Sequence, residues 1–114
     1  MPDFSIATTK DGNVADIVIA GELDMYTAPQ LRDTLVELTA TGVRQVTVDL
    51  AGVNFVDSTA LGVLVGGLKR LRQADGDLAL RAPRPSALKV MEMTGLTRVF
   101  TITQADGGAP GPPG

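Results

Sequence analysis

The sequence predicts an α/β fold, namely one domain with a mixed sheet of about five strands and three main helices. Short segments in which apolar and polar residues alternate, as in strands, are separated by segments with apolar residues every three or four positions, as in helices. The first two strand-like segments are joined by a tight turn, so an antiparallel hairpin should precede parallel βα units. The length of 114 residues suits one hydrophobic core.

The predicted hairpin consists of strands at residues 4–9 and 14–20. Bulky residues alternate with small ones in the first segment, and the second contains three β-branched residues in a row at 17–19. Between them, Asp11 and Gly12 tolerate the positive φ angles that a tight reversal requires. The two segments therefore predict an antiparallel pair at the start of the sheet.

The first helix is predicted to follow Thr27, whose hydroxyl is placed to cap it. Pro29 lies in the first turn, and Gln30 completes a capping box with Thr27. The helix should end at Gly42, with Val43 folding back onto the last turn. Its apolar face comprises Ala28, Leu31, Leu35 and Leu38.

A buried strand at residues 45–50 is predicted to lead into a second, apolar helix that opens near Asp57. The strand alternates β-branched and polar residues, whereas the following segment has the periodicity of a helix. The apolar stripe of this helix comprises Leu61, Leu64, Val65, Leu68 and Leu71. Because the loop that leaves the carboxyl end of such a strand commonly binds a ligand or partner, we expect the functional site around Ser58.

Asp57 and Ser58 stand at the start of this helix and allow two interpretations of the serine. Either side chain suits the N-cap position, where it would accept a hydrogen bond from the first turn. Alternatively, the Ser58 hydroxyl lies at the positive end of a helix on an exposed loop, where it is placed to receive a phosphate. The residue types alone do not choose between these interpretations.

Gly62 and Gly66 share one face of the second helix, although glycine is unfavourable inside helices. The favoured interpretation is a close approach of this face to the sheet, and the alternative is a flat surface that a partner can reach. Gly62, Gly67 and Lys69 also resemble a phosphate-binding loop. We reject nucleotide hydrolysis there, because backbone N–H groups inside a helix are already bonded and cannot hold a phosphate.

The remaining predicted elements are a strand at residues 77–81, a third helix at 86–94 and a short last strand at 99–103. Residues 105–114 are rich in glycine and proline and bury too little apolar surface to order themselves. We therefore expect a domain that spans residues 1–104, followed by a disordered tail.

Composition excludes several classes of function. The net charge of −3 provides no basic surface for direct nucleic-acid binding. The absence of cysteine and histidine removes disulfides, thiolate nucleophiles, imidazole bases and the commonest metal ligand. Glu22 and Asp24 form a carboxylate pair, but no other candidate ligand is fixed beside them, so solvated loop charges are the favoured interpretation. We expect no metal and no cofactor.

The N-terminus lacks a positively charged start followed by an apolar run, so no secretory signal is expected. No apolar run approaches about 18 residues, and we expect no membrane insertion. These features predict a cytoplasmic protein.

A receiver-type domain, phosphorylated on Asp49 or Asp57, is the nearest alternative among small α/β folds. It would need about five βα units and acidic metal ligands after its first strand. The chain has three predicted helices and opens with a hairpin, which disfavours this alternative.

Three segments carry a resemblance to a known family: residues 21–24 (GELD), 48–50 (VDL) and above all 55–62 (FVDSTALG). Together with the order of elements, they resemble the STAS family, specifically bacterial anti-sigma-factor antagonists, over roughly residues 4–103. The family often has glycine where this chain has Ala60, a departure within the first helical turn that leaves the serine intact.

The resemblance implies a partner-switching protein that has no catalytic activity. Unphosphorylated, it would bind an anti-sigma factor that is also a serine kinase, and so free a sigma factor for transcription. Phosphorylation of Ser58 would switch it off, and a serine phosphatase would restore it. The partner-binding residues implied are Asp24, Asp57, Ser58, Thr59 and Gly62. The alternative is a non-phosphorylated STAS adaptor or small-ligand-sensing subunit of a larger complex, in which Ser58 is only a cap.

Overall fold

The computed structural model describes residues 4–104, so the expected tail at 105–114 lies outside the described residues. The strands are β1 (Ser5–Asp11), β2 (Val14–Leu23), β3 (Gln45–Val56), β4 (Asp77–Arg81) and β5 (Thr101–Thr103). The helices are α1 (Ala28–Ala40), α2 (Ser58–Gln73) and α3 (Pro85–Met93), followed by a short 3-10 helix, η1 (Leu96–Arg98).

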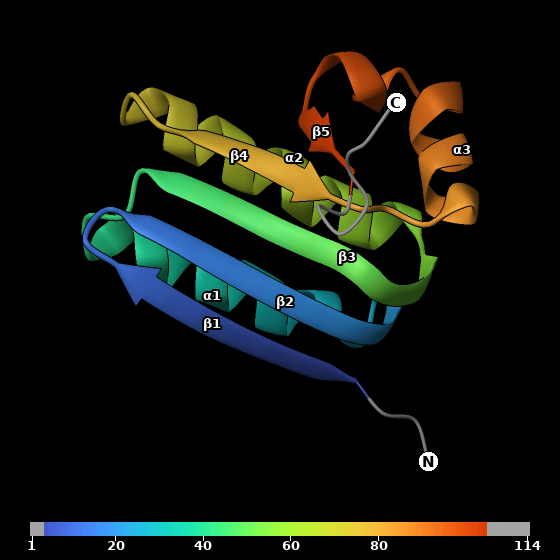
Figure 1. Ribbon diagram of the computed structural model, residues 1–114, viewed down its shortest axis with the longest axis horizontal. Coiled ribbons are helices and arrows are strands. Elements are labelled where there is room, and N and C mark those ends of the chain that lie inside the picture. The colour runs from blue at the N-terminus through green and yellow to red at the C-terminus, as the bar shows by residue number, and fades with distance from the viewer. Residues whose placement is uncertain (1–3, 105–114) are drawn as a thin grey trace.

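The five strands form one sheet in the order β1-β2-β3-β4-β5. Strand β1 runs antiparallel to β2, and every later pair of neighbours is parallel. Helices α1 and α2 lie side by side on one face of the sheet, whereas α3 lies near the end where β3 and β4 finish (Figure 1). The predicted α/β fold with its N-terminal hairpin is confirmed.

The core lies between the sheet and the inner faces of α1 and α2. All four residues of the apolar face predicted for α1 are buried. In α2, Leu64 is fully buried, whereas Val65 is only partly buried at the edge of the core. The predicted end of α1 is also confirmed, because Gly42 has a φ of 100° and the Val43 N–H donates to the Leu38 carbonyl at 3.0 Å.

Strands β2 and β3 are longer than the sequence pattern predicts, and they end at Leu23 and Val56. The alternation of apolar and polar residues in β3 fails after Leu50, yet the backbone continues to pair as far as Leu23 opposite Val56. Register shifts on either side of Gly21 absorb the irregularity. The extension carries the two strands together to the position where α2 begins.

Two local predictions are wrong. The Thr27 hydroxyl does not cap α1; it donates to the Glu22 carbonyl at 2.8 Å and accepts the Asp24 N–H at 2.9 Å. The last strand does not begin at Val99, because the N–H of Val99 bonds to the Leu96 carbonyl within the turn that follows η1. At Thr27, hydrogen bonds of the hydroxyl within the loop take the place of the predicted helix cap. At Val99, a hydrogen bond within a turn takes the place of the predicted strand pairing.

Asp49 and Arg81 face one another on neighbouring strands β3 and β4. The Arg81 guanidinium donates to Asp49 Oδ2 at 2.7 and 3.1 Å, and the Ala51 N–H donates to Asp49 Oδ1 at 2.9 Å. Burial by itself would raise the pKa of Asp49, but the hydrogen bonds from Ala51 and Arg81 outweigh it, so the pKa lies below its ordinary value.

Asp49→Asn is expected to lower the free energy of unfolding at pH 7 by about 0.5–1 kcal/mol, since Arg81 is partly exposed and solvent screens the pair. The Asp49 carboxyl has a lower pKa in the folded than in the unfolded chain. Its contribution is therefore complete above the unfolded pKa of about 3.9 and disappears as the pH falls through the folded pKa. Urea titrations at pH 7 and pH 3 should show the difference between variant and parent narrowing at pH 3; an equal difference at both pH values would contradict this account. Asp33→Asn, at an exposed pair, is the control.

Candidate functional site

The candidate site lies where β2 and β3 end and α2 begins, on the right of Figure 1. Asp57 directly follows Val56, the last residue of β3, and its N–H donates to the Leu23 carbonyl at the end of β2 at 3.2 Å. The loop that follows Leu23 carries Asp24. Parallel pairing of the two strands thus brings two loops that are far apart in the sequence to one edge of the sheet.

Asp57 is the N-cap of α2. Its backbone is extended, with φ −106° and ψ 179°, and its Oδ1 atom accepts the Ala60 N–H at 2.9 Å. The other carboxylate oxygen, Oδ2, accepts the Met25 N–H at 3.0 Å. One side chain therefore caps the helix and also ties it to the neighbouring loop.

Ser58 is the first residue of α2 and is exposed. Since Asp57 takes the N-cap position, the serine is not needed there. Within residues 4–104 the Ser58 hydroxyl makes no hydrogen bond, whereas the side chains of its neighbour Asp57 and of Thr27 on the adjoining loop are both engaged. The hydroxyl thus stands free at the positive end of a helix of 16 residues.

Asp24 organises the loop after β2. Its Oδ1 atom accepts the N–H groups of Tyr26 and Thr27 at 2.9 and 3.1 Å, an arrangement in which an aspartate closes a turn of its own backbone. The Asp24 carbonyl also accepts the N–H of Ala28 at 2.7 Å, at the start of α1. The two carboxylates of the predicted pair therefore have different surroundings. The Asp24 carboxylate accepts hydrogen bonds from backbone N–H groups, whereas Glu22 is exposed.

The structure also decides between the two interpretations of the glycine face. A Cβ atom added at Gly62 or Gly66 would meet nothing within 4 Å, so the favoured interpretation, a close approach to the sheet, is wrong for both. Gly67 is the packed glycine, because its Cβ would lie 2.7 Å from Leu35 Cδ1 of α1. Gly62 and Gly66 form an exposed surface, and Thr59 is exposed one turn away.

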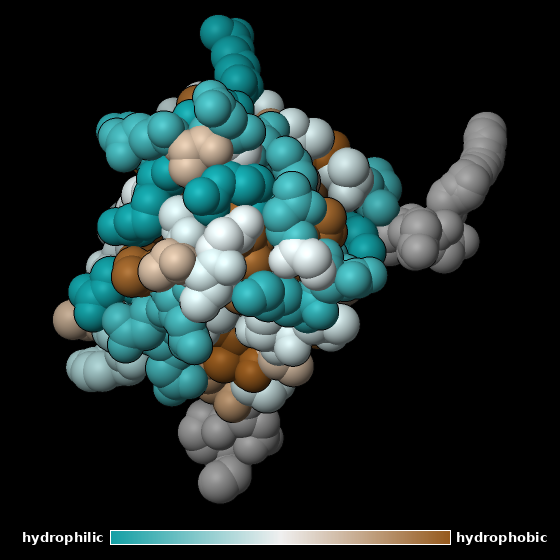
Figure 2. All heavy atoms as spheres, turned by 90° about the vertical axis from the view of Figure 1, so that its left-hand side faces the viewer, coloured by the Kyte–Doolittle hydropathy of each residue, from teal (hydrophilic) through white to brown (hydrophobic). Residues whose placement is uncertain are grey.

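Three exposed apolar side chains around this junction are absent from the predicted site, namely Met25, Tyr26 and Phe55, which we call the apolar rim. Tyr26 is 81% exposed, and Met25 and Phe55 are about half exposed. The opposite end of the molecule, beyond the β1–β2 turn, is mostly hydrophilic with scattered apolar areas (Figure 2). In the sequence, the apolar rim is indicated by two large apolar residues in the polar loop at 24–27. Exposed apolar side chains that lie close together are typical of contact surfaces.

The described part of the chain contains no group of three or more acidic, histidine or cysteine side chains that is placed to hold a metal ion. Nor is any helix within residues 4–104 long and apolar enough to cross a membrane. The chemistry available at the site is therefore that of a free hydroxyl, two hydrogen-bonded carboxylates and an apolar rim.

Comparisons with known proteins show which family the chain is similar to. A family model described as "Mlab, STAS domain" matches residues 6–103. The anti-sigma-B factor antagonist of Staphylococcus aureus is 33% identical over 102 residues, which cover 90% of this chain and 94% of that protein.

Two solved structures share the fold. The anti-sigma factor antagonist SpoIIAA in its unphosphorylated form aligns with a TM-score of 0.79 at 23% identity, over 90% of this chain and 88% of that one. The Bacillus cell fate determinant SpoIIAA in the phosphorylated form aligns with a TM-score of 0.73 at 23% identity, over 90% and 91%.

Proposed function

This chain belongs to the STAS domain family, and we propose that it is an anti-sigma-factor antagonist whose choice of partner is controlled at Ser58. In its unphosphorylated form it binds an anti-sigma factor that is also a serine kinase, and so releases a sigma factor. Phosphorylation of Ser58 ends this binding, and a serine phosphatase restores it. The role is that of a regulatory binding protein, as the name of the S. aureus relative indicates, and not that of an enzyme.

The observation that carries the proposal is the free hydroxyl of Ser58. A kinase must reach its target oxygen, and Ser58 is exposed and has no hydrogen bond to any described residue. Asp57 performs the capping that a serine at a helix start would otherwise supply. A Ser58 retained only for capping would duplicate its neighbour, which favours a role in modification.

Physical chemistry supports a switch that leaves the fold intact. A phosphate on Ser58 would add about −1.5 to −2 charges at a helix N-terminus, where the helix dipole and free N–H groups favour anions. SpoIIAA has been solved in an unphosphorylated and a phosphorylated form, and both share this fold. Release of a partner would then arise from charge and bulk at the interface, with repulsion added by the carboxylates of Asp24 and Asp57.

The surface around Ser58 suits a protein partner. The apolar rim belongs to the loop after β2, which Met25 ties to Asp57, and to the end of β3, while Thr59 and Gly62 continue along α2. An interface of this kind has an apolar centre that must lose its water on binding. A phosphate at the edge of the interface would hold water and oppose this loss of water. We assign partner contact to Asp24, Asp57, Ser58, Thr59 and Gly62.

Affinity capture from lysate of the source organism with Ser58→Ala and Ser58→Glu baits tests the proposal. We expect an ATP-binding protein of the serine kinase class to be held by the alanine bait and lost from the glutamate bait, because glutamate places a permanent charge where the phosphate would be. Bound proteins are identified by mass spectrometry. The control is Ser86→Glu, which introduces the same charge at an exposed position in the first turn of α3.

Both Ser58 baits should melt within a few degrees of the parent, since Asp57 still caps α2 in each and the added glutamate carboxylate is favourable in a first helical turn. Recovery of the same proteins with both baits would refute the switch and favour the non-phosphorylated adaptor. Recovery of no kinase-class protein with the alanine bait would refute the anti-sigma-factor antagonist itself.

A further inference from the structure

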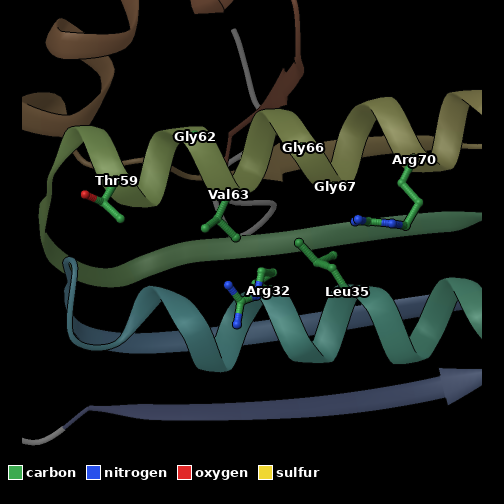
Figure 3. A pocket seen from close by; sticks show the side chains of 8 residues that line it. All are labelled: Arg32, Leu35, Thr59, Gly62, Val63, Gly66, Gly67 and Arg70. Carbon is green, nitrogen blue, oxygen red and sulfur yellow. The ribbon is translucent and has the colours of Figure 1, made fainter.

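A shallow groove of about 250 Å³ runs between α1 and α2. Its floor is apolar and includes Leu35 from α1 and Val63 from α2, and Figure 3 shows it bordered along α2 by the exposed glycines Gly62 and Gly66. Thr59, next to Ser58, lies at one end of the groove, and Arg70 lies at the other. The groove therefore begins beside the proposed switch.

The fold does not need the two glycines that border the groove. Glycine is less favourable in a helix than every residue except proline, yet Gly62 and Gly66 have open space where a Cβ would lie. Gly67 shows the contrast, because Leu35 packs directly against it. Two bare positions four residues apart on one helical face allow the backbone of another element to approach closely.

Two arginines give the groove a positive charge in a chain whose net charge is −3. Arg70 forms no ion pair with any residue in the range 4–104, and Arg32 meets only its neighbour Asp33, at 3.5 Å and largely exposed to solvent. Arg70 belongs to the last turn of α2, where a cation favours the helix dipole. Figure 3 shows, however, that its side chain is directed along the groove towards Leu35, away from that helix end.

We propose that this groove docks a helix of the anti-sigma-factor partner. The docked helix packs small and apolar residues against Gly62, Gly66 and Val63, and places carboxylates near Arg32 and Arg70. A helix fits because ridges of side chains on one helix pack into the groove between two others, and the paired cations require an acidic partner. This inference rests on the proposed function and extends its contact surface from Ser58 along α2 as far as Arg70.

The test compares three variants with the parent. Gly66→Ala adds one methyl group to the groove, Arg70→Glu reverses a charge in it, and Lys69→Glu makes the same reversal at an exposed neighbour that does not line it. Their affinities are measured by calorimetry against the purified kinase-class protein that the Ser58→Ala bait retains. Thermal melting of each variant verifies that the fold is intact.

We expect Gly66→Ala to melt about 2–8 °C higher than the parent, because it removes a helix-weakening glycine without a clash. Its affinity for the partner and that of Arg70→Glu should fall about tenfold or more, as for contacts at the centre of an interface. Lys69→Glu should remain within about twofold of the parent, as expected for a charge at the rim. A variant that is more stable yet binds less cannot be explained by damage to the fold.

Unchanged affinity of Gly66→Ala and Arg70→Glu would overturn the groove inference while the proposed function stands. An equal loss with Lys69→Glu would also overturn it, because the effect would then reflect net charge alone. If the Ser58→Ala bait retains no kinase-class protein, the proposed function fails and the docking inference fails with it.

Discussion

Gly76→Ala is expected to lower the free energy of unfolding by about 3 kcal/mol, at the upper end of the usual cost of overpacking. A Cβ atom at Gly76 would overlap the carbonyl oxygen of Arg44 and lie 2.9 Å from its carbonyl carbon. Both are backbone atoms, which no side-chain rotation can move aside. The carbonyl that would be displaced also accepts the Asp77 N–H at 2.9 Å, so the start of β4 would lose its anchor to the end of the loop before β3.

Urea titration of Gly76→Ala beside Gly66→Ala measures this effect against a matched control. The same substitution at Gly66 meets open space and should raise stability by about 0.5–1 kcal/mol. Opposite signs at two glycines ten positions apart would show that local space determines the outcome, since the chemical change is identical. A loss of less than about 1 kcal/mol at Gly76 would mean that the loop yields and that the close contact is not required.

Leu64→Ala is expected to destabilise the fold by about 2–5 kcal/mol, because it opens a cavity at the centre of α2. Leu64 is fully buried in the core between this helix and the sheet. Val36→Ala, a truncation of an exposed apolar side chain on α1, is the control and should cost much less. Urea titrations of both variants supply the comparison.

The same variant distinguishes folding from switching. At a temperature where Leu64→Ala remains folded, it should still bind the kinase-class partner and still lose it when Ser58→Glu is added, because Leu64 does not reach the surface. Loss of the response to Ser58→Glu in folded Leu64→Ala protein would indicate that the core transmits the signal and would contradict a purely interfacial switch.

The site combines features that were visible in the sequence with others that were not. The free position of Ser58 depends on which of two adjacent residues caps α2, and both residue types suit a cap. The choice follows from the neighbouring loop, since the Met25 N–H holds the second carboxylate oxygen of Asp57. That bond joins residues 32 positions apart, so no local preference could have predicted it.

The sequence by itself determined the α/β class, the hairpin, the apolar faces of α1 and α2 and the edge where the candidate site is proposed, because periodicity and turn chemistry are local properties. Only the tertiary structure decided the lengths of β2 and β3, the cap of α2, and which glycines are packed. Pairing with a remote strand extends β3 beyond its alternating segment, and the position of Leu35 on another helix separates Gly67 from Gly66. Those outcomes depend on atoms that are distant along the chain and adjacent in space.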